Sequence, residues 1–201
     1  MKPTRPELPR EFVAVHKRRR MIAAIAELSA EQGYEATKIA DIVSRAGVAR
    51  KTLYDNFDGK EALFLSAFDH YFNEATAAVE EACAAAGGGW RERIEAGLAA
   101  LLGFLDEQPA AARMCLVEAL SATPRSSVAY DEALAAFVAL LRGSGPPNEG
   151  LPETLEEALA GGVAWILHQR AREGGTGSIA ELAPELTGFV LSPYLGVRNS
   201  A

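Results

Sequence analysis

Apolar residues recur every three or four positions along almost the whole of this 201-residue chain, and that spacing is the period of an α-helix. A half-buried strand would need apolar and polar side chains to alternate, and no segment sustains such alternation. Glycine and proline interrupt the helical pattern only over short stretches. The sequence therefore predicts an all-α protein of about nine helices without a sheet.

The positions of these interruptions set the expected helix boundaries. Prolines at 3, 6 and 9 make residues 1–10 a flexible arm. Thr37 is expected to cap the second helix and Asp58 the fourth, which is long. The first three helices are expected at 11–33, from Thr37 to near Gly47, and at 49–56, and those after the fourth at 90–108, 110–122, 126–142, 153–173 and 179–191, with a Gly- and Pro-rich loop at 143–152.

Charge is distributed unevenly along the chain, whose net charge is -7. Residues 1–65 hold twelve Lys and Arg against nine Asp and Glu, whereas the remainder holds eight against eighteen. A basic first part joined to an acidic second part is a footprint of nucleic-acid binding by one end of a chain. The basic run 17–20 is either a solvated helix face or a group of phosphate contacts.

Other classes of protein fit the residues poorly. Without an apolar stretch of eighteen residues or a signal peptide, we expect a cytoplasmic protein with no membrane contact. Cys83 and Cys115 lie in apolar helical patterns without metal-ligand spacing, so buried thiols and no metal site are expected. The sequence has no G-x-S-x-G, H-E-x-x-H or phosphate-binding loop motif, and we expect neither catalysis nor a cofactor.

The most informative segment is 37–63, where two short helices are joined by a turn that contains Gly47. This is the form of a helix-turn-helix that binds double-stranded DNA, with the second helix in the major groove. Arg50 is the candidate base reader, and Leu53 and Phe57 are expected to face inward. Candidate phosphate contacts have hydroxyl or ammonium groups: Thr37, Lys38, Thr52, Tyr54 and Lys60.

A longer set of residues resembles the N-terminal domain of the TetR family of bacterial repressors: Arg20, Ala23, Ala24, Leu28, Gly33, Thr37, Ile42, Ala46, Gly47, Val48, Thr52, Leu53, Tyr54, Phe57, Lys60 and Leu63. The resemblance implies a homodimer that places two recognition helices in successive major grooves. Lys51 and Asn56 depart from the family's usual residues, which bears on the operator sequence. The expected DNA contacts are Arg20, Thr37, Lys38, Ala49, Arg50, Lys51, Thr52, Tyr54, Asn56 and Lys60.

The resemblance also implies that residues 11–57 form the DNA-binding domain and that 58–201 bind a ligand and dimerise. The ligand is expected to be a small apolar or amphipathic molecule. Glu118 either lies in the pocket, where it would favour cationic ligands, or on the surface. Candidate pocket residues are Phe68, Phe72, Phe104, Met114, Glu118, Trp165 and His168, and candidate dimer contacts are Leu155, Leu159, Gly162, Val163, Ile166, Leu182, Leu186 and Phe189.

These expectations combine into a dimeric repressor that binds a palindromic operator and is released by its ligand. Two alternatives stay open: a helix-turn-helix that meets another protein, and a DNA-binding protein that activates transcription or responds to no ligand. The identity of the ligand and the operator sequence are not encoded in any motif.

Overall fold

The computed structural model describes residues 10–144, 151–173 and 178–197, and within these ranges it contains nine α-helices, two short 3₁₀ helices and no strand. The expected all-α class is thereby confirmed. The arm expected at 1–10 lies, apart from Arg10, outside the described residues. None of the described helices is long and apolar enough to cross a membrane.

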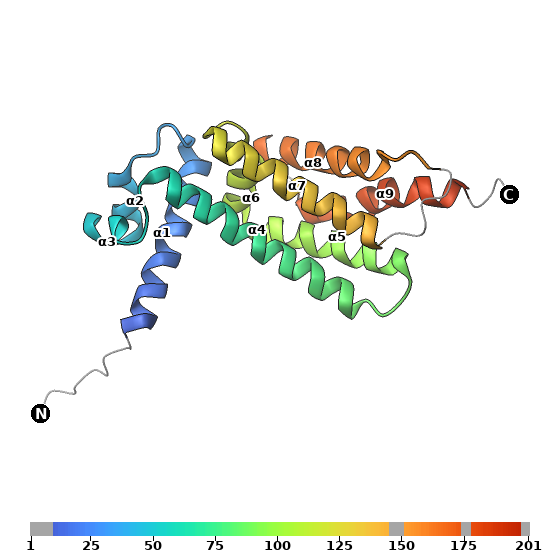
Figure 1. Cartoon of the computed structure of the whole chain (residues 1–201), viewed down its shortest axis with the longest axis horizontal. Coiled ribbons are helices and arrows are strands. Elements are labelled where there is room, and N and C mark those ends of the chain that lie inside the picture. Colours follow the sequence, from blue (N-terminus) through green and yellow to red (C-terminus); the bar gives the residue numbers. More distant parts are fainter. Residues whose placement is uncertain (1–9, 145–150, 174–177, 198–201) are drawn as a thin grey trace, which may run out of the picture.

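The first three helices form one end of the molecule, which we name the head: α1 (Arg10–Gln32), α2 (Ile39–Ala46) and α3 (Arg50–Tyr54) (Figure 1). Arg45 on α2 forms ion pairs with Glu27 (3.1 Å) and Glu31 (2.8 Å) on α1. Because Ile25 and Ile42 are fully buried, the two helices also share an apolar contact surface. The N-terminal part of α1 projects beyond the rest of the head (Figure 1).

The remaining helices form the body of the molecule (Figure 1). The helix α4 begins beside the head and packs along α5. The helix α7 packs against α8, and α9 packs against α5. The bounds of these elements are α4 (Lys60–Ala85), α5 (Trp90–Glu107), α6 (Pro109–Leu116), η1 (Glu118–Leu120), α7 (Pro124–Ser144), α8 (Leu155–Glu173), η2 (Ile179–Leu182) and α9 (Ala183–Val197).

The head shares its hydrophobic core with part of the body. One cluster of buried residues joins α1–α4 with Met114 on α6 and Ala119 on η1. A second cluster joins α5 with α7, α8 and α9. Since close-packed side chains transmit displacements to their neighbours, α6 and η1 are mechanically connected to the head.

Several boundaries differ from those expected. The helix expected at 110–122 ends at Leu116, and Val117 forms a turn between α6 and η1. The last helix continues through Pro193 to Val197, although proline removes one main-chain hydrogen-bond donor. Neither Thr37 nor Asp58 caps a helix: α2 follows Lys38, whose N–H donates to Asp41, and α4 follows Gly59, which has a φ of +135°.

Candidate DNA-binding surface and ligand cavity

The turn between α2 and α3 has a defined geometry. Gly47 adopts φ +58° and ψ +43°, a left-handed conformation that glycine reaches at little cost. The N–H of Gly47 donates to the Ser44 carbonyl (3.1 Å), and that of Val48 donates to the Val43 carbonyl (3.0 Å). Arg20 on α1 donates to the Gly47 carbonyl at 3.4 Å. The direction in which α3 leaves the turn is therefore fixed by the backbone and by α1.

The helix α3 has one buried side and one exposed side. Leu53 is fully buried, and Phe57 just beyond the helix is nearly so, as the sequence predicts. Arg50, Lys51 and Tyr54 are exposed. The Arg50 guanidinium donates to the Tyr54 hydroxyl (3.4 Å) and lies 5.8 Å from the centroid of its ring. An exposed cation and a hydroxyl thus lie next to each other, one helical turn apart.

The other residues expected at this surface are placed less uniformly. Lys38, Ala49 and Asn56 are exposed, and the Asn56 amide donates to the Thr52 carbonyl at 2.8 Å. Thr37 is only 1% exposed, and its hydroxyl donates to the Gly33 carbonyl at 2.8 Å. Thr37 therefore holds the end of α1 and is not free to contact a phosphate, which corrects the expectation drawn from its hydroxyl group.

Lys60 lies at the first residue of α4 and contacts the loop between α1 and α2. Its ammonium donates to the Tyr34 carbonyl (2.9 Å) and lies 4.0 Å from the centroid of the Tyr34 ring. A lysine ammonium has three protons, so this hydrogen bond leaves donors for a further acceptor. Lys60 is half-buried at the junction between head and body.

The basic run of α1 is exposed, but most of it also contacts neighbouring elements. The Arg18 guanidinium lies 4.5 Å from the centroid of the Phe57 ring. The Arg19 guanidinium lies 3.6 Å from the Glu74 carboxylate on α4, and Arg20 reaches Gly47 as described above. Exposed ion pairs contribute little to stability, so these cations remain available to an anionic partner.

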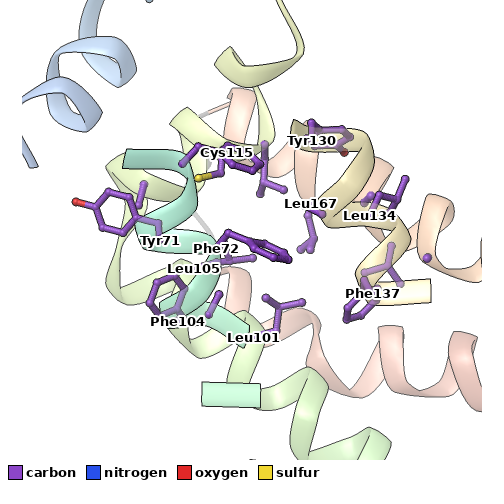
Figure 2. A pocket seen from close by; sticks show the side chains of 18 residues that line it. Tyr71, Phe72, Leu101, Phe104, Leu105, Cys115, Tyr130, Leu134, Phe137 and Leu167 are labelled. Atoms are coloured by element: carbon purple, nitrogen blue, oxygen red, sulfur yellow. The ribbon is translucent and has the colours of Figure 1, made fainter. Parts of the chain in front are cut away.

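A cavity of about 140 Å³ lies within the body (Figure 2). Phe68, Phe72 and Phe104, all expected to line a pocket, are part of its wall. The Phe68 and Phe72 rings are stacked with centroids 6.4 Å apart, and the Phe72 ring extends toward the middle of the cavity in Figure 2. The full lining is Phe68, Tyr71, Phe72, Ala75, Leu101, Phe104, Leu105, Ala111, Cys115, Leu116, Tyr130, Ala133, Leu134, Phe137, Ala160, Val163, Ala164 and Leu167.

The cavity wall is almost entirely hydrocarbon. Among the described residues that line it, none carries a charged side chain, and the polar side-chain atoms belong to Tyr71, Tyr130 and Cys115. Burial raises the pKa of Tyr71 and that of Cys115 to about 12, so both groups are neutral near pH 7. The Tyr71 hydroxyl points away from the cavity (Figure 2). The cavity can therefore hold an apolar group but not an unpaired charge.

Four residues expected in the pocket lie outside it. Met114 is fully buried in the core shared with the head. Trp165 is 62% exposed and stacks on His168, whose Nδ1 lies 2.8 Å from the Leu116 carbonyl. The Glu118 carboxylate accepts a hydrogen bond from the Tyr34 N–H. Because Val163, Ala164 and Leu167 occupy the cavity side of α8, Trp165 lies on another side of that helix.

The sequence reasoning named no individual residue of α7 as part of the cavity wall. Tyr130, Leu134 and Phe137 are spaced by four and three residues and form one side of α7. This spacing was visible in the sequence, but it is equally typical of a helix side that packs in a core.

The expected dimer contacts divide into two groups. Leu159, Val163, Leu182 and Leu186 are buried within this one chain and are not available to a partner, which corrects that part of the expectation. Leu155, Gly162 and Ile166 are half-buried, and Phe189 is 43% exposed. A Cβ atom on Gly162 would lie 3.0 Å from the Phe189 ring, so α8 and α9 approach each other closely at this glycine.

Comparison with known proteins identifies the head. Residues 21–67 match the family of bacterial regulatory proteins described as the tetR family. The chain is 44% identical over 61 residues to an uncharacterized HTH-type transcriptional regulator, YezE, of Bacillus subtilis, and 27% identical over 99 residues to the HTH-type transcriptional activator FasR of Mycolicibacterium smegmatis. These matches cover 30% and 49% of this chain and 31% and 43% of the relatives, so the chain matches less than half the length of either.

The whole fold is similar to that of a solved regulator. The transcriptional regulator FadR of Bacillus subtilis, in complex with stearoyl-CoA, superimposes with a TM-score of 0.77 and 19% identity over 87% of this chain and 97% of that one. An identity this low supports the fold alone. The match at 21–67 and the arrangement of α2, the Gly47 turn and α3 together give the classification. Residues 21–67 of the head therefore form a domain of the tetR family of bacterial regulatory proteins.

Proposed function

We propose that this protein is a DNA-binding transcriptional repressor that acts as a homodimer and leaves its operator when a small apolar or amphipathic molecule enters the cavity. Residues 11–57 bind DNA in this proposal, and residues 58–201 bind the ligand and dimerise. The observation that carries it is the two-sided α3, which buries Leu53 and exposes Arg50, Lys51 and Tyr54 beside a fixed turn.

The exposed side of α3 has the chemistry that the major groove requires. Arg50 lies at the first residue of α3, and an arginine can donate two hydrogen bonds to the O6 and N7 atoms of a guanine. Lys51, Tyr54, Lys38 and Lys60 offer donors for phosphates, which position a protein on DNA without reading its sequence. Arg20 holds the turn and remains exposed, so it contributes to the same phosphate-binding surface.

The proposed dimer contact lies on the exposed surface of α8 and α9. Trp165 and Phe189 are large apolar residues exposed there, and Gly161, where a Cβ atom would meet nothing within 4 Å, allows a second helix to approach closely. Leu155 and Ile166, which the sequence analysis gave as candidate dimer contacts, are half-buried and extend the apolar side of α8. Two heads related by such a contact suit a palindromic operator whose half-sites are about 34 Å apart.

The ligand is proposed to be an apolar molecule or the hydrocarbon part of an amphipathic one. Glu118 lies outside the cavity, so nothing in the wall favours a cation. The structurally similar FadR of Bacillus subtilis was solved with stearoyl-CoA, a long acyl chain on a polar carrier. A space of this size holds a group about as large as benzene, so a longer chain must displace the Phe72 ring.

Displacement of Phe72 is the proposed route from ligand to DNA. The helix α4 lines the cavity through Phe68 and Phe72 and begins at Lys60 beside the head. A ligand releases the operator only if it binds better to the conformation that misplaces the heads, with a coupling of about 1 to 3 kcal/mol. Equal ligand affinity for free and operator-bound protein would contradict this mechanism.

The experiment that tests the proposed function is selection from a pool of genomic DNA fragments by the purified protein across a series of salt concentrations. We expect retained fragments to share a palindrome and their affinity to fall steeply with salt, because phosphate contacts release counterions. Binding that is absent, or insensitive to salt, would instead support a helix-turn-helix that meets another protein.

Activation is the second candidate function, and one observation favours it. FasR of Mycolicibacterium smegmatis, which matches 49% of this chain, is a transcriptional activator. Repression and activation share the same DNA-binding surface and differ in where the operator lies relative to the promoter. Mapping the recovered palindrome against the start of transcription distinguishes them, since repression predicts overlap with the polymerase site.

A further inference from the structure

Tyr34 lies in the loop between α1 and α2, and both its backbone N–H and its backbone carbonyl form hydrogen bonds with side chains of the body. Its N–H donates to Glu118 Oε2 on η1 at 2.9 Å, and its carbonyl accepts from Lys60 Nζ on α4 at 2.9 Å. The same carbonyl accepts from the Thr37 N–H at 3.1 Å. Its ring packs edge-on against Phe64 of α4, with centroids 4.9 Å apart. Tyr34 is therefore a junction between head and body.

The loop is shaped to bring its backbone close to Glu118. Gly33 ends α1 with a φ of +85°, a left-handed conformation that favours glycine. A Cβ atom at Gly33 would lie 3.7 Å from Glu118 Oε2, so the carboxylate rests against this turn. The Gly33 carbonyl accepts a hydrogen bond from the Thr37 hydroxyl, and Thr37 lies two residues before the start of α2. Glu118 thus contacts the segment that sets where α2 begins.

Glu118 is itself firmly placed by the body. The hydroxyl of Ser126, at the start of α7, donates to the carbonyl of Ala119 at 2.7 Å and is fully buried. His168 on α8 contacts the carbonyl of Leu116 at 2.8 Å. Cys115 and Leu116, which immediately precede this turn, line the cavity. A change in the cavity wall at α6 is therefore two or three residues along the chain from the Glu118 contact.

We infer that Glu118 is a positioning residue through which the body sets the DNA-binding orientation of the head, by fixing Tyr34 and, through its carbonyl, Lys60. This inference rests on the proposed function. Glu118 touches no DNA in it and acts on the phosphate contact of Lys60 and on the start of α2. A charged acceptor makes a stronger hydrogen bond than a neutral one, which explains the choice of a carboxylate.

The test compares Glu118→Ala, Glu118→Gln and the unaltered protein in binding to the duplex recovered by the genomic selection. Removing the acceptor leaves the Tyr34 N–H unpaired, and we expect DNA affinity to fall about tenfold. Glutamine keeps an acceptor oxygen, so its loss should be only about twofold to threefold. Glu132→Ala removes an equal charge from an exposed position on α7 and should leave affinity unchanged.

Two readouts separate positioning from general stability. Amide hydrogen exchange at Tyr34 should accelerate in Glu118→Ala and, less strongly, in Glu118→Gln, and it should not change in Glu132→Ala. The glutamine variant keeps the test valid if Glu118→Ala does not fold. In a double-mutant cycle with Lys60→Met, the effect of Glu118→Ala on DNA affinity should shrink below about threefold, because both act through Tyr34.

The outcomes that overturn the inference are distinct from failure of the proposed function. Equal DNA affinity of Glu118→Ala and the unaltered protein, or additive effects with Lys60→Met, overturn the positioning role while DNA binding stands. Absence of DNA binding by the unaltered protein overturns both, and it leaves the Tyr34 exchange rates to report only a structural contact.

Discussion

At the scale of single residues, Arg50 combines exposure with a fixed place at the start of α3. Arg50→Ala should weaken operator binding by about 1 to 3 kcal/mol and relax the preference at one base pair in each half-site, because a bidentate arginine reads one guanine. Binding to a panel of operators with single substitutions measures both effects. Arg91→Ala removes a guanidinium from an exposed position on α5, in the body, and serves as the control.

A uniform loss of affinity across that panel would assign Arg50 to a phosphate. The structure makes this distinction meaningful, since the Arg50 guanidinium is also 3.4 Å from the Tyr54 hydroxyl. This hydrogen bond allows the Tyr54 hydroxyl to orient the Arg50 guanidinium. Tyr54→Phe should therefore broaden base preference slightly if Tyr54 positions Arg50, and should only lower affinity if Tyr54 itself contacts DNA.

Cys115 offers a second residue-scale prediction. Burial raises its pKa to about 12, and the thiolate that reacts with alkylating agents is then scarce at about pH 8. Cys83 on α4 is half-buried, as Cys115 is, and burial raises its pKa against the opposing effect of the nearby Arg93 guanidinium. Iodoacetamide at about pH 8 should modify Cys83 first, as measured by mass spectrometry of the peptides. Rapid modification of Cys115 would mean that water reaches this part of the cavity wall.

At the scale of elements, α4 and the segment from α6 to η1 both connect the cavity to the head. Ala133→Leu on α7 adds a branched side chain to the cavity wall and imitates an occupant. It should lower operator affinity by about tenfold, within the usual range of allosteric coupling. Ala136→Leu makes the same change on the exposed side of α7 and should have no effect.

The same cavity-filling substitution tests how the two connections share the effect. If part of the effect of Ala133→Leu on DNA affinity is transmitted through η1, that substitution should reduce DNA affinity less in a Glu118→Ala background than in the unaltered protein. An identical factor in both backgrounds would place the whole effect on α4. An unchanged affinity in Ala133→Leu itself would argue against control by the cavity.

Helix periodicity predicted which elements exist but not how each is turned within the body. It correctly placed Leu53 and Phe57 inside the head, because the apolar side of α3 lies opposite its basic side. The helix α8 is apolar on more than one side, with Leu159 and Val163 on one and Trp165 on another. The sequence pattern therefore could not decide which side faces the cavity and which side is exposed.

Contacts between distant segments were also beyond the sequence pattern. Glu118 lies among apolar residues, which placed it equally well in a pocket or at the surface. Its partner, the Tyr34 N–H, is 84 residues away and is a backbone group that no motif marks. Thr37 resembled a helix cap for the same reason. Its hydroxyl donates instead to the Gly33 carbonyl, and that carbonyl comes within reach only when the end of α1 and the following loop have folded.

At the scale of the whole molecule, the proposed dimer makes a direct prediction. Trp165→Glu puts a charge on the exposed apolar surface of α8 and should convert dimers to monomers in sedimentation experiments. Operator affinity should fall with it, because two linked heads bind two half-sites with a high effective concentration. Leu195→Glu is the matched control, as Leu195 lies on the side of α9 that faces Arg91 and Glu95 of α5.

A dimer that persists in Trp165→Glu would place the contact elsewhere. If the unaltered protein is a monomer that still binds one half-site, the DNA-binding proposal stands, but the proposed palindromic operator does not. The same sedimentation and binding experiments give both results. They therefore test the dimer contact independently of DNA binding by α3.

The hydrocarbon wall of the cavity has a consequence for what such a protein can distinguish. Hydrogen bonds allow a site to reject a molecule that lacks one particular group, and this wall has almost none to offer. Each buried methylene contributes about 0.8 kcal/mol, close to a fourfold gain in affinity, until the space is full. In the proposed function, the protein therefore distinguishes ligands by the apolar area that each one buries in the cavity. It would respond to a chemical class of ligands instead of to one compound.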